Sequence, residues 1–517
     1  VGWAPIAQPP TVTGISPLTT LASGGIPVGW NTGTKIVAPL NDQGVSDSFG
    51  WSVAMNSDGT KVVVGVKDRD TPGYSNSGAA YIYTYSGGSW DAGIKIVAFD
   101  GATNDEFGRS VSMSGDGTKV IVGAWSEDMN GSSDAGSAYI FTYDSSSSTW
   151  DAGIKIPHLL YSTGDKFGWS VDMSSDGTKI IVGAPYNDNV QGDSGAAYTF
   201  TYDSSSSTWG SELRIKASDA ESNDYFGDSV AMSGDGNKVI VGAHAEDPGG
   251  DSYAGSVYIF TYDSSNSNWG SQVKIDLALD KAPNDYFGWS VAMSGDGNKI
   301  IVGARDEEPG GLLDAGSAYI FTYGLTNYNQ WDAGTKIVAS DGAAPSDHFG
   351  YSVAMNSDGT KVVVGAFNED PDGISDAGSA YIFTYSDGSW DVGTKIVAPD
   401  KAVADYFGRA VSISGDGNKV IVGADQDASP TTSYTGSASI FDYQATELFD
   451  ASTQAFTATG TGIVSGSTVQ LEGADGSLYS VSNVTPNAAG TQVTFKMGTL
   501  GVSSNATVAN QPYKVRI

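Results

Sequence analysis

The dipeptide Phe-Gly recurs along most of this chain at a nearly constant interval. Successive copies are 58, 60, 59, 61, 62 and 58 residues apart. A fixed period of this length indicates a tandem array of one supersecondary unit, and it constrains the fold more than composition does. The seven copies begin at Phe49, Phe107, Phe167, Phe226, Phe287, Phe349 and Phe407.

Each copy has the pattern of four short antiparallel strands. In the copy that begins at Phe107, FGRSVSMS alternates like a strand, GDGT is a hairpin turn, and KVIVGA is typical of a strand buried on both faces. GSAYIFTYD and WDAGIKI supply a third and a fourth strand. No stretch has a convincing helical period. Seven such units predict an all-β chain that forms a seven-bladed β-propeller.

The tryptophans predict how the ring of blades closes. A Trp opens the fourth strand of the first six copies, but the last copy has no such strand after it. The missing strand occurs before the first copy, where Trp30 precedes NTGTKIVA. We therefore expect the N-terminal strand to complete the last blade of a propeller that spans residues 29–443, which would protect the sheet edges.

An Asp stands two residues before every Phe-Gly. Seven identical copies favour a structural role, in which the carboxylate accepts backbone N–H bonds in the loop that leads into the inner strand. These residues are Asp47, Asp105, Asp165, Asp224, Asp285, Asp347 and Asp405.

The run FG-x-S-V-x-x-S-x-D-G-x-K-V-x-V-G-A resembles the FG-GAP repeat family, which includes the integrin α-subunit head and many bacterial and viral surface proteins. The resemblance implies a seven-bladed propeller, usually extracellular and usually used in adhesion or recognition. The family's calcium loop, D-x-D-x-D-G, does not carry over. Hairpins such as SGDGTK hold a single Asp, whereas calcium takes roughly six to eight oxygen ligands.

The chain outside the predicted propeller lacks the Phe-Gly repeat. Residues 444–517 read as short strands with Gly turns, and QAFTATGTG within them resembles the IPT/TIG immunoglobulin-like family. The first strand of that family resembles PTVTGISP at 10–17. We expect segment 1–28 to supply the first strand of an Ig-like β-sandwich completed by 444–517, with the propeller inserted between its first and second strands. Both parts loosely resemble fibre and surface proteins of marine phages and algal viruses.

Composition limits the partners. The formal net charge of −33 repels nucleic-acid phosphates and anionic lipid heads, so we expect no nucleic-acid partner. No apolar run approaches the roughly 20 residues that span a bilayer, so we expect no direct membrane insertion. The absence of Cys excludes disulfides and thiolate metal sites. The chain begins without Met or a signal-peptide pattern, and we interpret it as a processed product or a piece of a longer protein.

Acidic loops between the second and third strands are the candidate metal sites. Their carboxylates, with Gly and Ser carbonyls nearby, could hold Ca²⁺. The alternative is that they are solvated turn residues that cap loop amides. No other cofactor is expected. The calcium candidates, chosen from two short loops that each hold several carboxylates, are Glu127, Asp128, Asp134, Glu369, Asp370 and Asp376.

Variable aromatic and basic residues beside the recurring framework are the candidates for recognition. They follow Phe-Gly or the end of the second strand, and such side chains stack well on sugars or protein partners. The alternative is that individual members pack between blades. The candidate recognition face comprises Trp51, Arg109, Trp125, Trp169, Trp289, Arg305, Tyr351, Phe367 and Arg409.

Together these patterns predict a module without enzymatic activity, located outside the cell, on the cell surface or on a virion. Its propeller would bind a cell-surface glycan or protein, and its Ig-like domain would join neighbouring subunits or domains of a larger fibre or filament. The three histidines fall in different copies and no nucleophile has a suitable setting. Two alternatives stay open: a purely structural decoration protein without ligand, and a propeller enzyme that degrades polysaccharide.

Overall fold

The computed structural model describes residues 29–188, 192–277, 280–324, 330–428 and 434–444, together with six strands outside these ranges. The chain divides into two compact units. One consists of Thr32–Asp442, and the other of Val1–Asn31 with Tyr443–Ile517. Of the predicted N-terminal segment 1–28, only 11–17 belongs to the described residues.

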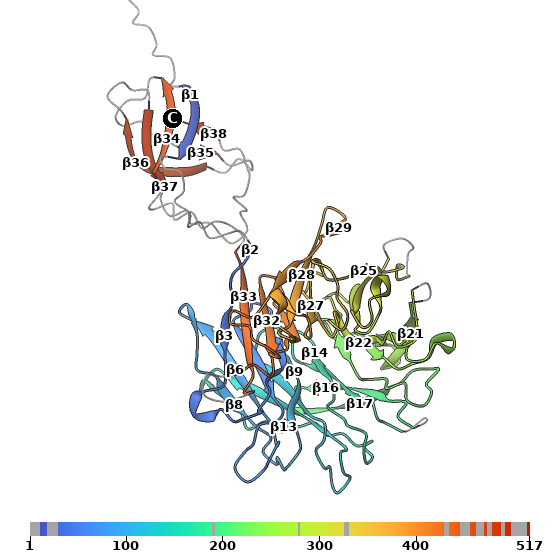
Figure 1. Ribbon diagram of the computed structural model, residues 1–517. Coiled ribbons are helices and arrows are strands. Elements are labelled where there is room, and N and C mark those ends of the chain that lie inside the picture. The colour runs from blue at the N-terminus through green and yellow to red at the C-terminus, as the bar shows by residue number, and fades with distance from the viewer. Residues whose placement is uncertain are drawn as a thin grey trace, which may run out of the picture. The chain divides into compact units, whose positions relative to one another are not determined.

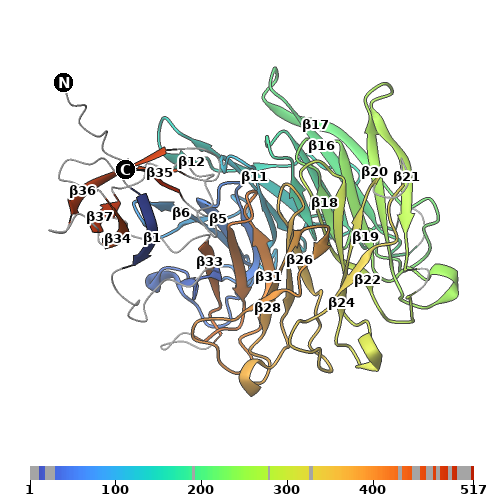
Figure 2. The same ribbon diagram turned by 90° about the horizontal axis from the view of Figure 1, so that it is seen from above.

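The larger unit is an all-β seven-bladed propeller. Its sheets follow one another in chain order, from blue through green and yellow to orange in Figures 1 and 2. The first three blades contain β4 (Phe49–Met55), β5 (Lys61–Val66), β6 (Ala79–Ser86), β7 (Ser89–Trp90) and β8 (Ile94–Ile96); β9 (Phe107–Met113), β10 (Lys119–Ala124), β11 (Ser137–Asp144), β12 (Thr149–Trp150) and β13 (Ile154–Lys155); β14 (Val171–Met173), β15 (Lys179–Ala184), β16 (Ala196–Asp203) and β17 (Thr208–Ile215).

The next three blades continue the same order from the inner to the outer strand. They contain β18 (Val230–Met232), β19 (Lys238–Ala243), β20 (Ser256–Asp263) and β21 (Asn268–Ile275); β22 (Phe287–Met293), β23 (Lys299–Ala304), β24 (Ser317–Thr322) and β25 (Thr335–Ile337); β26 (Ser352–Met355), β27 (Lys361–Ala366), β28 (Ser379–Ser386), β29 (Ser389–Trp390) and β30 (Thr394–Ile396). Short 3₁₀ turns cover Leu40–Asp42, Pro248–Gly250, Pro309–Gly311 and Pro371–Gly373.

The last blade combines strands from both ends of the propeller region. It contains β31 (Phe407–Ile413), β32 (Lys419–Ala424) and β33 (Ser437–Gln444). Two short strands from before the first copy, β2 (Gly29–Trp30) and β3 (Thr34–Ile36), pair antiparallel with β33. In Figure 1 the blue β3 lies beside the orange β33. The outer strand is divided in two in this blade, as it is in the first, second and sixth, a detail that the sequence pattern did not predict.

The second strand of each blade is buried on both faces, as its apolar run predicts. In β10, Val120, Ile121 and Val122 are fully buried. Alternate residues of such a strand enter different clusters, each built from two neighbouring blades, so that Val120 packs with Val63 of the blade before. The apolar core of the propeller is therefore a series of interfaces between adjacent sheets.

The Asp before each Phe-Gly has the structural role that its recurrence predicted. The Asp105 carboxylate accepts the backbone N–H of Ala102 at 2.6 Å, and Asp285 accepts that of Ala282 at 2.5 Å. The other five copies make the same contact. All seven side chains are buried. Each one therefore fixes the loop that leads into an inner strand.

A serine hydroxyl joins the inner strand of each of six blades to the next blade. Ser52 Oγ donates to the carbonyl of Gly108 at 2.9 Å, and five further serines repeat the bond. In the seventh blade Ala410 occupies this position. The junction between the last and the first blade therefore lacks the hydroxyl donor that its six counterparts have.

Replacing Ala410 by Ser is expected to supply that donor to the carbonyl of Gly50 and to stabilise the propeller by about 1 kcal/mol. The measurement is the free energy of unfolding in urea. Ser352→Ala is the matched control, because it removes the hydroxyl that donates to Gly408 at 2.8 Å. It should destabilise the fold by a similar amount, and an Ala410→Ser protein no more stable than the parent would contradict the assignment.

The smaller unit contains a six-stranded sheet. Its order is β1 (Thr11–Pro17), β34 (Ala455–Thr461), β37 (Gln492–Met497), β36 (Leu478–Pro486), β35 (Gln470–Glu472) and β38 (Lys514–Arg516). The N-terminal β1 pairs antiparallel with the C-terminal β34, from Thr11 opposite Thr461 to Pro17 opposite Phe456. The remainder of the predicted Ig-like region lies outside the described residues. No helix in the described part of the chain is long and apolar enough to cross a bilayer.

Candidate recognition face at the mouth of the channel

The central channel opens between the starts of the seven inner strands. There each Phe-Gly pair is held tightly: the Phe is buried and the Gly has a φ between +93° and +100°. The next residue of every blade lines a cavity of about 270 Å³ around the axis, the mouth cavity. This inner ring consists of Trp51, Arg109, Trp169, Asp228, Trp289, Tyr351 and Arg409.

The opposite end of the channel is narrower and is formed by the ends of the same strands. A cavity of about 120 Å³ there is lined by six methionines, by Ile413 and by small Ser and Gly residues. Backbone bonds link successive blades at this level, for example from Ser57 N–H to the Gly115 carbonyl at 3.0 Å. This end is built from recurring residues, whereas the mouth is built from variable ones.

Two further sets of variable residues surround the inner ring. The second ring follows the second strand of each blade and consists of Lys67, Trp125, Pro185, His244, Arg305, Phe367 and Asp425. The third set is the residue between Asp and Phe-Gly, and all seven members have a left-handed backbone with φ between 52° and 60°. Its members are Ser48, Glu106, Lys166, Tyr225, Tyr286, His348 and Tyr406.

Ring contacts connect these sets into one surface. Trp125 and Trp169 meet edge to face with centroids 5.0 Å apart, and Lys166 lies 3.7 Å from the Trp125 centroid. Across the ring, the Arg305 guanidinium lies 3.5 Å from the Trp289 ring. Such stacking of cations on aromatic faces holds long side chains in place. The mouth is therefore a packed surface of partly exposed aromatic and basic groups.

All nine residues predicted for recognition lie on this surface. Six belong to the inner ring, and Trp125, Arg305 and Phe367 belong to the second ring. Each is partly exposed, so none is lost in the core. Many also contact residues of neighbouring blades, as the alternative interpretation expected. Many of these side chains therefore pack against a neighbouring blade and are also partly exposed to solvent.

The prediction left out several members of the surface. Lys67 of the second ring and Lys166, Tyr225, Tyr286 and Tyr406 of the third set were not among the candidates. The signal was present, because the middle residue of Asp-x-Phe-Gly varies while its neighbours do not. Its importance depends on the left-handed backbone conformation, which the sequence pattern did not reveal.

Arg109 and Arg409 differ from the other basic residues of the mouth. Within the described ranges, neither guanidinium forms a hydrogen bond or an ion pair; both make cation–π contacts. Arg109 lies 4.3 Å from the Trp169 ring, and Arg409 lies 4.1 Å from the Trp51 ring. Burial lowers the pKa of Arg109. Tyr351 and Asp228 oppose this shift, and the nearby Arg409 adds to it.

Most other charged groups of the mouth have partners close by, but Oδ1 of the buried Asp425 has no hydrogen-bond partner among the described residues, and the charge of Arg409 acts on this carboxyl. Lys67 is paired with Asp68 at 2.8 Å. Asp306 contacts His348 at 2.7 Å, and Glu106 accepts the Trp125 indole N–H at 2.8 Å. Asp228, the single carboxylate of the inner ring, lies 3.3 Å from His244 Nδ1. The two arginines are therefore the cations of the inner ring whose N–H groups remain available.

The six calcium candidates are engaged in contacts within their own blades. Lys155 donates to Glu127 at 2.7 Å and Lys395 donates to Glu369 at 2.8 Å, and a serine hydroxyl donates to each carboxylate. Asp128 and Asp370 accept backbone N–H bonds from Asp134 and Asp376 at 2.9 and 2.7 Å.

These contacts correspond to the alternative interpretation, in which the acidic residues stabilise the loops. No group of three or more His, Cys, Asp or Glu side chains among the described residues is arranged to hold a metal ion. The geometry therefore does not favour calcium at Glu127 or Glu369.

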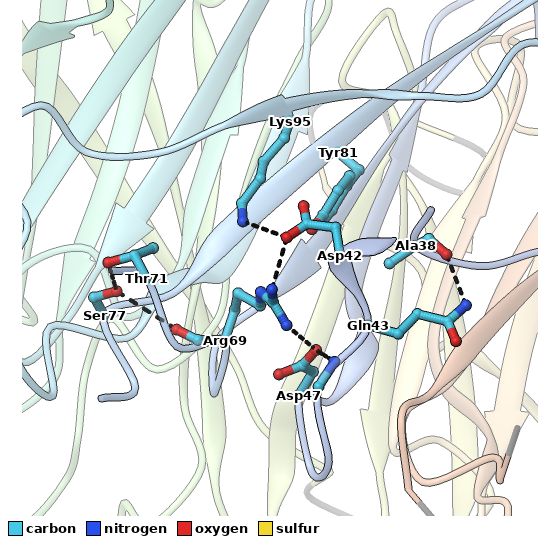
Figure 3. Close-up of polar contacts among 10 residues, drawn as sticks. Ala38, Asp42, Gln43, Asp47, Arg69, Thr71, Ser77, Tyr81 and Lys95 are labelled. Carbon is cyan, nitrogen blue, oxygen red and sulfur yellow. Dashed lines mark hydrogen bonds and ion pairs between the residues drawn. The ribbon is translucent and has the colours of Figure 1, made fainter. Parts of the chain in front are cut away.

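A network in the first blade shows how this ion-pair position varies. Arg69 takes the place that Glu127 has in the second blade, and it donates to Asp42 at 2.6 Å and to Asp47 at 2.8 Å (Figure 3). Lys95 also reaches Asp42, at 3.0 Å. A cation at this position of the first blade replaces the anion of the second blade, and it binds carboxylates instead of a lysine. Such an exchange is expected for a structural ion pair.

The repeated segments match the sequence profile of a known family. The sequence profile of the FG-GAP repeat matches seven segments that together cover more than half of the chain: 30–83, 90–141, 161–200, 209–260, 269–321, 331–383 and 390–441. No curated protein matches the chain.

Proposed function

Because the chain belongs to the FG-GAP repeat family, we propose that its propeller is a recognition module that binds a cell-surface glycan or protein at the channel mouth. The observation that carries this proposal is the concentration of variable, partly exposed aromatic and basic residues at one end of a scaffold whose other positions recur. Loops on a rigid frame are the usual place for binding residues. We place the protein outside the cell, on a cell surface or on a virion.

The chemistry at the mouth supports binding without catalysis. Glycoside hydrolysis uses a pair of carboxyl groups on either side of the scissile bond. Asp228 is the single carboxylate of the inner ring, and it lies beside His244. The inner ring thus offers stacking faces and cations instead of the two acids that a hydrolase requires.

The smaller unit is the part that we propose to be Ig-like, related to IPT/TIG domains, and to link the propeller to a larger fibre or filament. The pairing of β1 with β34 supports this idea, because an inserted propeller requires both ends of the chain in one sheet. We also propose that the pairing of β3 with β33 closes the ring of blades.

A glycan array probed with the full chain, followed by product analysis, tests the function. We expect binding to a subset of glycans, no shortening of the bound chains, and loss of binding when Trp289 is replaced by Ala. Depolymerised products would instead indicate an enzyme. A native assembly with ordered lateral contacts and no ligand would indicate a structural decoration protein.

A further inference from the structure

The mouth cavity places two arginines beside one indole. The Arg409 and Arg109 guanidinium carbons lie 4.1 Å and 5.3 Å from the Trp51 ring. Each arginine also contacts a second ring, because Arg409 lies 4.9 Å from Tyr351 and Arg109 lies 4.3 Å from Trp169. Stacking of this kind leaves the N–H edges of a planar guanidinium directed away from the rings.

Those N–H edges have no protein acceptor among the described residues. A partly buried guanidinium without an acceptor is unfavourable, because desolvation is not offset by hydrogen bonds. The two like charges also oppose each other. An anionic group in the mouth cavity, in contact with both N–H edges, would relieve both effects, since carboxylate and sulfate oxygens match the donor geometry of guanidinium.

The negative net charge of the chain does not prevent an anionic group from binding at the mouth. Charges on exposed groups are screened beyond about 8–10 Å at moderate ionic strength. Near the cavity, the carboxylates of Asp68 and Asp306 are each paired with a neighbouring base. Asp228 acts on Arg109 and Asp425 on Arg409, so these two carboxylates offset part of the positive charge. Three of the six arginines of the chain, Arg109, Arg305 and Arg409, lie at this mouth.

We propose that the mouth cavity binds an acidic glycan, with the carboxylate or sulfate of one sugar residue held by Arg109 and Arg409 against the tryptophans of the inner ring. This inference rests on the proposed recognition function and specifies the ligand class. A cavity of about 270 Å³ is smaller than the roughly 300–1,000 Å³ pockets that enclose drug-sized ligands. It therefore suits one small residue of a longer chain.

The choice of a glycan over an acidic peptide follows from the spacing of the groups. Each guanidinium lies within 4.3 Å of a tryptophan ring, so the ligand must present an anion and an apolar face almost together. A uronic acid or sulfated sugar has both on one ring. In a peptide they come from different residues, whose Cα atoms are about 3.8 Å apart even for neighbours.

The test uses the full chain and a panel of uronate- and sulfate-bearing oligosaccharides, together with their methyl-esterified and desulfated counterparts and polyglutamate. Binding is followed by calorimetry and tryptophan fluorescence. We expect at least one acidic oligosaccharide to bind, its neutral counterpart to bind at least tenfold more weakly, and Arg109→Gln and Arg409→Gln each to weaken binding at least tenfold. Arg214→Gln is the matched control, because Arg214 lies on β17, the outer strand of the third blade.

Each other outcome overturns the inference. Equal binding of neutral and acidic glycans would refute the anion site but leave glycan recognition standing. Tighter binding of polyglutamate would identify an acidic protein as the partner. Absence of any glycan binding would refute the glycan assignment itself. The comparison of neutral and acidic ligands uses the unmodified protein, so the inference stays testable if an arginine variant fails to fold.

Discussion

Gly242→Ala is expected to destabilise the propeller by an amount at or above the upper end of the roughly 1–3 kcal/mol typical of overpacked cores. A methyl group at this position would lie 2.1 Å from the Gly288 carbonyl oxygen of the next blade and 2.3 Å from Ser229 Oγ. The backbone of the neighbouring blade would have to move. Urea unfolding monitored by tryptophan fluorescence measures the loss.

Gly210→Ala is the matched control for this substitution. Gly210 lies on β17 with nothing within 4 Å of an added methyl group, so its effect should stay within about 0.5 kcal/mol. Similar losses at both positions would show that contact between blades does not explain the recurrent glycine. The equivalent Gly of every blade has its virtual methyl 2.0–2.1 Å from a carbonyl oxygen, so the same result is expected at all seven.

The free energy of unfolding is expected to rise as the pH falls from 8 to about 5. Burial raises the pKa of Asp285 to about 7, and it raises those of five equivalent aspartates to about 6. In the unfolded chain such carboxyls titrate near about 3.9. Between these values the folded protein binds more protons than the unfolded chain, so acid favours folding by up to about 1.4 kcal/mol per pH unit for each group.

This increase in the free energy of unfolding should end at about pH 4, where the same carboxyls titrate in the unfolded chain. Below that value, aspartates whose pKa is lowered, such as Asp116 and Asp296 in the first hairpins, lose the stabilisation that their ionised forms provide. The measurement is the urea midpoint at pH 8, 6, 5 and 3. A midpoint at pH 5 no higher than that at pH 8 would contradict the prediction.

A pair of variants separates the buried aspartates from the overall charge. Asp285→Asn keeps an oxygen that accepts the Ala282 N–H but removes the titration. It should reduce the difference between pH 5 and pH 8 by on the order of 2 kcal/mol. Asp144→Asn, on an exposed outer turn, should leave that difference unchanged, because the lowered pKa of Asp144 acts only in more acidic solution. Equal effects of both variants would assign the pH dependence to net charge.

The sequence predicted where the nine candidate recognition residues lie better than it predicted the local contacts. The nine residues occupy two positions of the repeat, one after Phe-Gly and one after the second strand. Equivalent positions of a propeller lie around the same end of its axis, so the fold brings these residues to one mouth. Glu127 and Glu369 were different. They lie in loops, whereas their partners Lys155 and Lys395 lie on the outer strands β13 and β30. A run of carboxylates in the sequence looks alike whether a lysine or a metal ion neutralises it.

The sequence by itself determined the number of blades, the buried second strands and the structural Asp before each Phe-Gly. It could do so because a fixed period places equivalent residues at equivalent radii around one axis. Only the tertiary structure decided which side chains neutralise each other and which remain available. Arg69 is held by Asp42 and Asp47, whereas Arg109 and Arg409 keep their N–H edges open at the mouth. The difference between these arginines depends on side-chain contacts between blades and loops, and the repeat pattern does not specify the distances in those contacts.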